Sequence, residues 1–173
     1  MTTAITKLPR LWVGYILAVV FLIAEIAVML KGNLEFLLTT VGLVSWVYWL
    51  YCVYKFHDVM ERIPGYRHPI ASNRAVAMHF IPFYNFYWTF KWPKEIATFV
   101  NWRIQARSMS GAVVGVLVLL AVIIMRAVDG FLGLLLLSRA GVYISRRIGR
   151  ALSAPPVPAS AMEPPGVRGP LGL

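Results

Sequence analysis

Long apolar stretches dominate the N-terminal third of the chain. Residues 11–30 and 34–54 carry one acidic residue each and no basic residue, and each is close to the roughly 20 residues that cross a bilayer as a helix. Lys31-Gly32-Asn33 separates them and predicts a turn. The first stretch is longer than the apolar core of a signal peptide, and no small-residue cleavage site follows it. We therefore expect an uncleaved hairpin of two membrane-spanning helices.

The second of these helices is expected to continue beyond the membrane. Its second half is crowded with Trp and Tyr, as in the aromatic belt at a membrane surface, at Trp46, Tyr48, Trp49, Tyr51 and Tyr54. No helix-breaking residue follows until Pro64-Gly65, so the helix is predicted to run to about Arg62.

A second pair of apolar stretches follows residue 110. Residues 111–128 and 130–147 are each long enough for a span of about 18 residues. A single long helix through Leu137 is the alternative, but it would leave Arg126 and Asp129 in the middle of the membrane. A hairpin that turns near Asp129-Gly130 moves both charges towards a surface, which costs less free energy. The pattern therefore predicts a third and a fourth transmembrane helix.

The segment between the two hairpins, residues 75–107, is aromatic but does not read as a fifth span. Its uncharged part is only about 16 residues long, short for a crossing, and Pro82 interrupts it. Both flanks are basic, so a crossing would place one basic flank outside. We expect a re-entrant or an interfacial element, and the sequence leaves these two forms open. Pro93 is expected to start an amphipathic helix, with Ile96, Phe99, Val100 and Ile104 on one face.

The predicted fold is thus an all-α membrane domain over residues 1–153. It has four transmembrane helices, with a re-entrant or interfacial aromatic segment and an amphipathic helix between the second and the third. Residues 154–173 are rich in Pro, Ala, Gly and Ser. Because such a composition cannot bury a core, we expect a disordered tail.

Composition agrees with a membrane location. Hydrophobic residues make up 59% and charged residues 14% of the 173 residues, and the mean hydropathy is +0.69. A soluble domain is closer to roughly one-half apolar and one-quarter charged, so a soluble globule and a disordered chain are both excluded as the main architecture. Cys52 is the only cysteine, which excludes an internal disulfide and a C-x-x-C motif.

The net charge of +10 is distributed unevenly. Fourteen Lys and Arg residues precede the first span, lie in the long middle connection or follow the last span, whereas the two short connections hold only Lys31 and Arg126. Basic residues gather on the cytoplasmic side of membrane proteins. We therefore expect both termini and the middle connection to lie in the cytoplasm.

Aromatic and basic residues gather in the middle connection, and ten of the 23 aromatic residues lie between Phe80 and Trp102. Trp and Tyr favour the headgroup layer, and Lys and Arg are attracted to anionic lipid, which is a nearer partner here than nucleic acid. The candidate interfacial or lipid-binding residues are His79, Pro82, Asn85, Trp88, Lys91, Trp92, Lys94, Trp102 and Arg103.

Charged residues inside the predicted spans are candidates for function, because they are costly in a membrane and are usually paired. Glu25 and Arg126 are expected at similar depth near the outer face, which predicts an ion pair between them. Arg139 lies near the middle of the fourth span and needs a partner. These three residues would serve a small transporter or channel subunit, which is the alternative to a protein without transport activity.

Two further patterns have ordinary and functional interpretations. His57 and Glu61 are four residues apart and could hold a metal with His68 or His79, but a solvated, ion-paired helix is the simpler interpretation, and we expect neither metal nor cofactor. Gly111 and Gly115 form a G-x-x-x-G motif that allows close helix approach, either within the chain or to a second copy. The C-terminal tail is another possible contact for a protein partner.

The stretch Phe80-Ile-Pro-Phe-Tyr-Asn85, preceded by a Trp- and Tyr-rich helix and basic residues, resembles an uncharacterised family of bacterial membrane domains. That family has a Phe-Ile-Pro-x-x-Asn core between its second and third helices. The resemblance implies a four-helix protein of the bacterial inner membrane, and it brings no activity or catalytic residue. We expect a non-enzymatic scaffold or interaction protein; a lipid-modifying enzyme that uses His79 and Asn85 is a further alternative.

Overall fold

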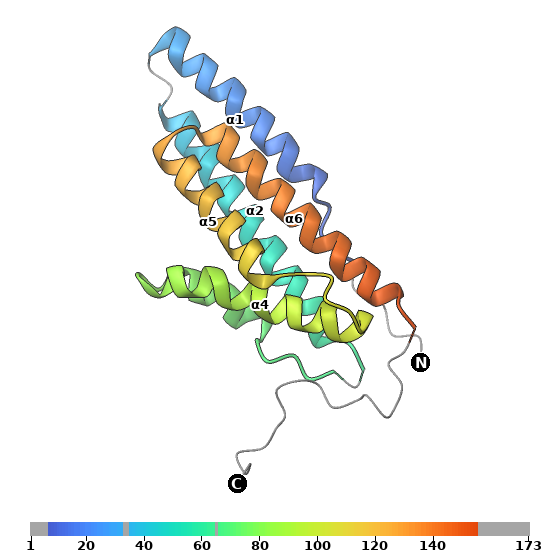
Figure 1. The fold of residues 1–173 in the computed structure, drawn as a ribbon. Helices are drawn as coiled ribbons and strands as arrows, with labels where there is room; N and C mark the ends of the chain where they lie inside the picture. Colours follow the sequence, from blue (N-terminus) through green and yellow to red (C-terminus); the bar gives the residue numbers. More distant parts are fainter. Residues whose placement is uncertain (1–6, 33–34, 65, 156–173) are drawn as a thin grey trace.

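The computed structural model describes residues 7–32, 35–64 and 66–155. Within these ranges the chain forms six α-helices and one short 3-10 helix, and no strand. Four long helices lie side by side (Figure 1): α1 (Trp12–Lys31), α2 (Glu35–Glu61), α5 (Gly111–Ala127) and α6 (Gly130–Ser153). The remaining elements, α3 (Ser72–Ala77), η1 (Met78–Phe80) and α4 (Tyr84–Ile104), form a transverse element at one end of this bundle.

Helix α6 contacts each of the other three long helices. It packs against α1 and α5 and also touches α2 and α4. Because α1 in turn packs on α2, the order around the bundle is α5, α6, α1, α2, and α2 has little contact with α5. The side of α6 that faces these neighbours repeats at helical spacing and consists of Gly133, Leu137, Ala140, Ile144 and Ile148, all buried.

The helix ends that flank both predicted hairpin turns lie at the end of the bundle away from the transverse element. Gly32 ends α1 with a left-handed φ of 72°, and its N–H donates to the carbonyl of Val28 at 2.8 Å. The carboxylate of Asp129 caps α6 by accepting a hydrogen bond from the Leu132 N–H at 2.7 Å. The chain after residue 110 is therefore a hairpin and not one long helix.

Two helices are long and apolar enough to cross a membrane, namely α1 and α2. Helix α5 is apolar but has 17 residues, and α6 carries four arginines. Most of α1 is not covered by protein, since only Ala18 and Ala24 are buried. Large apolar side chains such as Ile16, Val19 and Ile23 are half or more exposed, and exposed apolar surface of this kind is typical of sites that contact membrane or another protein.

The prediction that Pro93 starts a helix is wrong, because Pro93 lies inside α4, which begins at Tyr84. Proline removes one backbone hydrogen bond from a helix interior. Here the helix continues because it buries one face at helical spacing, with Trp88, Trp92 and Ile96 all at most 3% exposed. The predicted disordered tail lies outside the described residues from residue 156 onwards.

Candidate functional site

An exposed group of aromatic and apolar side chains, which we call the aromatic patch, covers η1 and the start of α4. Its members are Phe80, Ile81, Phe83, Tyr84, Phe86 and Tyr87, which are 37–88% exposed. Figure 1 shows α4 crossing the end of the bundle with its first turns projecting beyond the long helices. Phe83 is 88% exposed and has a φ of 62°, a strained conformation for an aromatic residue. Strain of this kind concentrates at functional sites.

The inward side of the transverse element is held by hydrogen bonds to a single carbonyl. Trp88 Nε1 donates to the Ala75 carbonyl oxygen at 3.0 Å, and His79 Nδ1 donates to the same oxygen at 2.8 Å. Trp92 is fully buried and packs edge-on against Trp49 of α2. His79, Trp88 and Trp92, candidates for lipid binding, therefore support the fold from within.

The basic candidates have three different environments. Lys91 makes an ion pair with Glu95 at 2.8 Å, and this contact raises the pKa of Lys91 despite partial burial. Lys94 is exposed. Arg103 donates hydrogen bonds to the carbonyls of Ala151 and Ala154 at 3.3 and 3.2 Å, where a cation favours a helix C-terminus. Of the three, Lys94 is the one that is exposed and takes part in none of the side-chain ion pairs formed by the described residues.

The last of the candidates also differ in role. Pro82 and Asn85 are exposed beside the aromatic patch, while Trp102 stacks on Tyr66 with ring centroids 5.3 Å apart. Sequence reasoning missed Asn101, whose Oδ1 accepts from the N–H groups of Ser108 and Met109 at 2.8 and 2.9 Å. A lone Asn in an aromatic helix gives no signal that it organises the α4–α5 connection.

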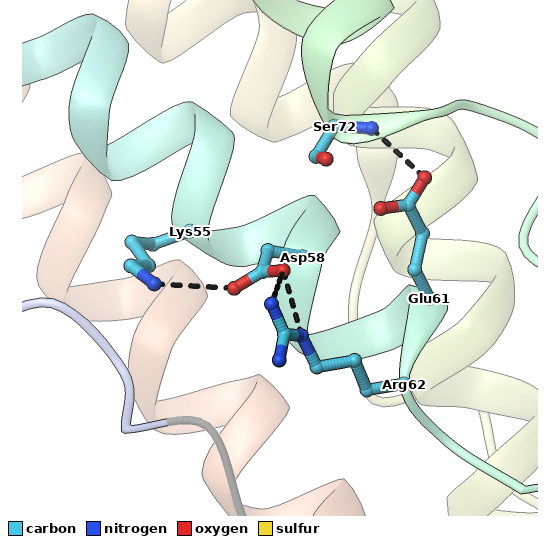
Figure 2. A network of polar contacts seen from close by, with 5 residues as sticks. All are labelled: Lys55, Asp58, Glu61, Arg62 and Ser72. Atoms are coloured by element: carbon cyan, nitrogen blue, oxygen red, sulfur yellow. Dashed lines mark hydrogen bonds and ion pairs between the residues drawn. The ribbon is translucent and has the colours of Figure 1, made fainter.

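Two sets of polar contacts lie at the end of α2, and one of them reaches α3 (Figure 2). The Asp58 carboxylate accepts from Lys55 at 3.1 Å and from Arg62 at 2.8 Å, and Glu61 Oε1 accepts from the Ser72 N–H at 3.0 Å. Burial alone would raise the pKa of Asp58, but the hydrogen bonds from Arg62 and Lys55 outweigh it and hold that pKa low. Asp58 thus makes the ion pairs along the helix that the sequence predicts, and Glu61 joins α2 to α3.

A histidine pair lies next to these contacts. His57 Nδ1 is 2.7 Å from His68 Nε2, so one of these nitrogens carries a proton and donates to the other. His57 is fully buried, and its Nε2 and the Nδ1 of His68 have no partner among the described residues. Burial holds the pKa of His57 well below its ordinary value and lowers the pKa of His68 to about 4. Both imidazoles are therefore neutral at pH 7.

The described residues contain no group of three or more His, Cys, Asp or Glu side chains placed to hold a metal ion. In particular, Glu61 binds the backbone at Ser72, and His79 binds the Ala75 carbonyl. The possible set of His57, Glu61 and a third histidine is therefore not assembled.

Glu25 and Arg126 do not form the predicted ion pair within the described part of the chain. Glu25 Oε1 accepts a hydrogen bond from the Gly130 N–H at 3.1 Å, at the N-terminus of α6, where the helix dipole favours an acid. Arg126 is exposed at the end of α5, and Arg139 is exposed on α6. The backbone N–H of Gly130 satisfies Glu25 in place of Arg126.

Gly111 and Gly115 make the close helix approach within the chain. A Cβ atom at Gly111 would overlap the backbone of Lys94, and one at Gly115 would lie 2.6 Å from Phe90. Both glycines are buried against α4. The motif thus seats α5 on the transverse element, and this contact leaves no room there for a second copy.

Comparisons with protein families, curated proteins and solved structures found no similar protein. The resemblance of the Phe80–Asn85 stretch to bacterial membrane domains therefore stays a prediction.

Proposed function

We propose that the chain is a four-span integral membrane protein whose transverse element rests on the cytoplasmic headgroup layer. In this proposal it acts as a non-enzymatic scaffold that contacts anionic lipid through the aromatic patch and the exposed basic residues near it. The single observation that carries the proposal is the position of α4, which crosses the end of the bundle with its aromatic start exposed.

The uncovered apolar surface of the long helices supports a lipid environment. Besides α1, helix α5 exposes Val113, Val116, Leu120 and Ile123. Apolar side chains on the side of a helix that no protein covers favour lipid over water. With 17 residues, α5 is about 25 Å long, which is close to the roughly 30 Å of a bilayer core.

The placement of polar residues along the bundle supports the proposed depth. Tyr48, whose hydroxyl donates to the Arg10 carbonyl at 2.7 Å, marks the level at which α1 begins. Trp46 lies at nearly the same level and packs edge-on against Phe80 of the transverse element, with ring centroids 5.0 Å apart. The aromatic belt of α2 and the aromatic patch therefore occupy one layer, as expected at a headgroup boundary.

The distribution of charge supports the proposed orientation. The transverse element and the connections on either side of it carry Arg67, Arg74, Lys91, Lys94 and Arg107, and the last turns of α6 add Arg146, Arg147 and Arg150. The opposite end of the described bundle has only Lys31 and Arg126. A basic surface beside exposed aromatic rings suits an anionic leaflet, since each basic residue near such a surface contributes about 1 kcal/mol to binding.

A lipid-depth measurement tests this proposal. A polarity-sensitive dye is attached at Phe86→Cys in a Cys52→Ala background, and the protein is reconstituted in vesicles with and without phosphatidylglycerol. We expect a blue-shifted emission that lipids brominated near the headgroup quench. The same dye at Ser153→Cys, on the last turn of α6, is the control and should report water.

The anionic preference is read from the same vesicles. Lys94→Gln should reduce the difference in Phe86→Cys emission wavelength between vesicles with and without phosphatidylglycerol. Quenching of the dye by brominated lipid, which reports its depth, should not change. A dye at Phe86→Cys that reports water in both lipid mixtures would contradict the proposal.

A further inference from the structure

A lateral groove opens between α2 and α5, where the two helices have little contact. It has a volume of about 520 Å³ and is lined by Phe21 of α1, by Leu38, Gly42 and Trp46 of α2, and by Met125 and Arg126 of α5. This volume is within the range of roughly 300–1,000 Å³ that is typical of small-molecule sites. We infer that the groove binds one acyl chain of an anionic phospholipid, with Arg126 at the phosphate.

The shape of the groove fits a chain rather than a compact ligand. From Leu38 to Trp46 it extends over two turns of α2, about 12 Å. Phe21 packs beside Gly42, where an added Cβ would lie 3.5 Å from the ring. Trp46 and Phe80 close the inner end by their edge-on contact.

The lining of the groove is almost entirely apolar. Its hydroxyl group, on Thr39, already donates to the Glu35 carbonyl at 3.0 Å. Leu43 on the rim is 60% exposed, so the groove opens sideways, towards the lipid in the proposed membrane position. An acyl chain is the ligand that this medium supplies at high concentration.

Arg126 gives the groove its charge preference. It takes part in none of the ion pairs formed by the described residues, and its expected partner Glu25 is bound to Gly130. Glu25 packs against Gly130 at the α5–α6 turn. Lys31 is six residues further along α1, so it lies about 9 Å beyond that turn. The guanidinium of Arg126 is thus left to bind phosphate, which it does through paired hydrogen bonds.

Native mass spectrometry of the full chain in detergent tests the inference, with phosphatidylglycerol and phosphatidylcholine of equal chain length as probes. We expect one phosphatidylglycerol per chain to be retained in preference to phosphatidylcholine. Arg126→Gln should weaken phosphatidylglycerol binding about fivefold, whereas Lys31→Gln, which removes a basic residue near the same end, should not.

A second pair of variants tests the acyl-chain part of the site. Gly42→Leu fills the groove and should abolish one-to-one retention of either lipid. Val47→Leu adds volume on an exposed position of α2 outside the groove and should retain it. Equal lipid retention by all four variants would mean annular lipid only and would overturn the inference.

The inference rests on the proposed membrane location, but the two fail separately. If the dye at Phe86→Cys reports water while Arg126→Gln still weakens lipid retention, the transverse-element proposal is wrong and the groove stands. If the dye reports lipid and the groove variants bind like the unmodified chain, the groove assignment is wrong.

Discussion

The Nδ1 atom of His57 lies 2.7 Å from the Nε2 atom of His68, and the far nitrogen of each ring is buried without a partner in the described chain. The two residues come from α2 and from the connection that follows it, so the pair joins the part of that connection around His68 to α2. Trp92 packs edge-on against His57 with ring centroids 6.2 Å apart. Neutral imidazoles fit this site, and charged ones do not.

The histidine pair predicts that acid destabilises the protein. Both histidines titrate near pH 6.5 when unfolded, whereas in the folded chain the pKa of His57 is well below that value and that of His68 is about 4. The unfolded chain therefore binds more protons, and stability falls as the pH drops from about 6.5 towards 4. We expect the Tm in detergent to fall by about 5 °C from pH 7 to pH 4.5.

A double variant isolates the contribution of the pair. His57→Gln/His68→Gln should have a lower Tm at pH 7 and a smaller change between pH 7 and pH 4.5. Glu61 and Glu95, whose charges face His68 and oppose the lowering of its pKa, stay in place. An unchanged pH dependence would assign the acid effect to other groups.

The glycines of α5 predict a contrast between two alanine substitutions. At Gly111 a Cβ would overlap the backbone of Lys94, so Gly111→Ala should cost about 1–3 kcal/mol and lower the Tm. Gly149 also lies in a helix, but a Cβ there would be 3.9 Å from the nearest side chain, on Leu8. Gly149→Ala should therefore be neutral or stabilising by up to about 1 kcal/mol. Equal thermal shifts would contradict the α4–α5 packing.

Phe83 predicts a separation between stability and lipid contact. Its φ of 62° costs about 1–3 kcal/mol for a residue with a bulky side chain, and glycine adopts this conformation freely. Phe83→Gly should raise the Tm in detergent, while the dye at Phe86→Cys in the same chain should shift towards water. Phe86→Gly, inside α4, should lower the Tm by contrast. A lower Tm for Phe83→Gly would show that the ring stabilises the fold.

Arg103 predicts that one basic residue of the transverse element acts on the fold and not on lipid. Arg103→Gln removes two hydrogen bonds to the end of α6, each of which contributes roughly 0.5–1.5 kcal/mol. The Tm should fall by a few degrees. Arg107→Gln, at an exposed position, should leave the Tm unchanged. If the Tm responds equally to both, the capping role is wrong.

Periodicity and turn residues predicted that four long helices form and where the turns between the paired helices lie, because Gly32 and Asp129-Gly130 are local signals for helix ends. The fourth was predicted to end near residue 147, whereas α6 continues to Ser153. The extent of α4 was not predictable in this way. Pro93 signals a helix start locally, but tertiary burial of Trp88, Trp92 and Ile96 extends α4 back to Tyr84. Packing between elements that are distant in sequence, and not a local signal, thus sets the start of α4.

The candidate site was predicted as a region rather than as a set of roles. Composition marked the aromatic segment, but which rings point inwards depends on the Ala75 carbonyl, which binds both Trp88 and His79. Depth counting placed Glu25 and Arg126 together, although a backbone N–H at Gly130 is the actual partner of Glu25. Sequence spacing does not predict that Glu25 binds a backbone group 105 residues away.

The central claim is that the chain spans the membrane four times with the transverse element on the cytoplasmic side. Cysteine labelling of intact cells with a membrane-impermeant maleimide tests it most directly. The positions are Lys31→Cys, Val128→Cys and Ser153→Cys in a Cys52→Ala background, all exposed in the structure. We expect labelling at positions 31 and 128 in intact cells, and at position 153 only after permeabilisation. Protection of position 128 together with labelling of position 31 would contradict the third and fourth spans, and labelling of position 153 from outside would contradict the orientation.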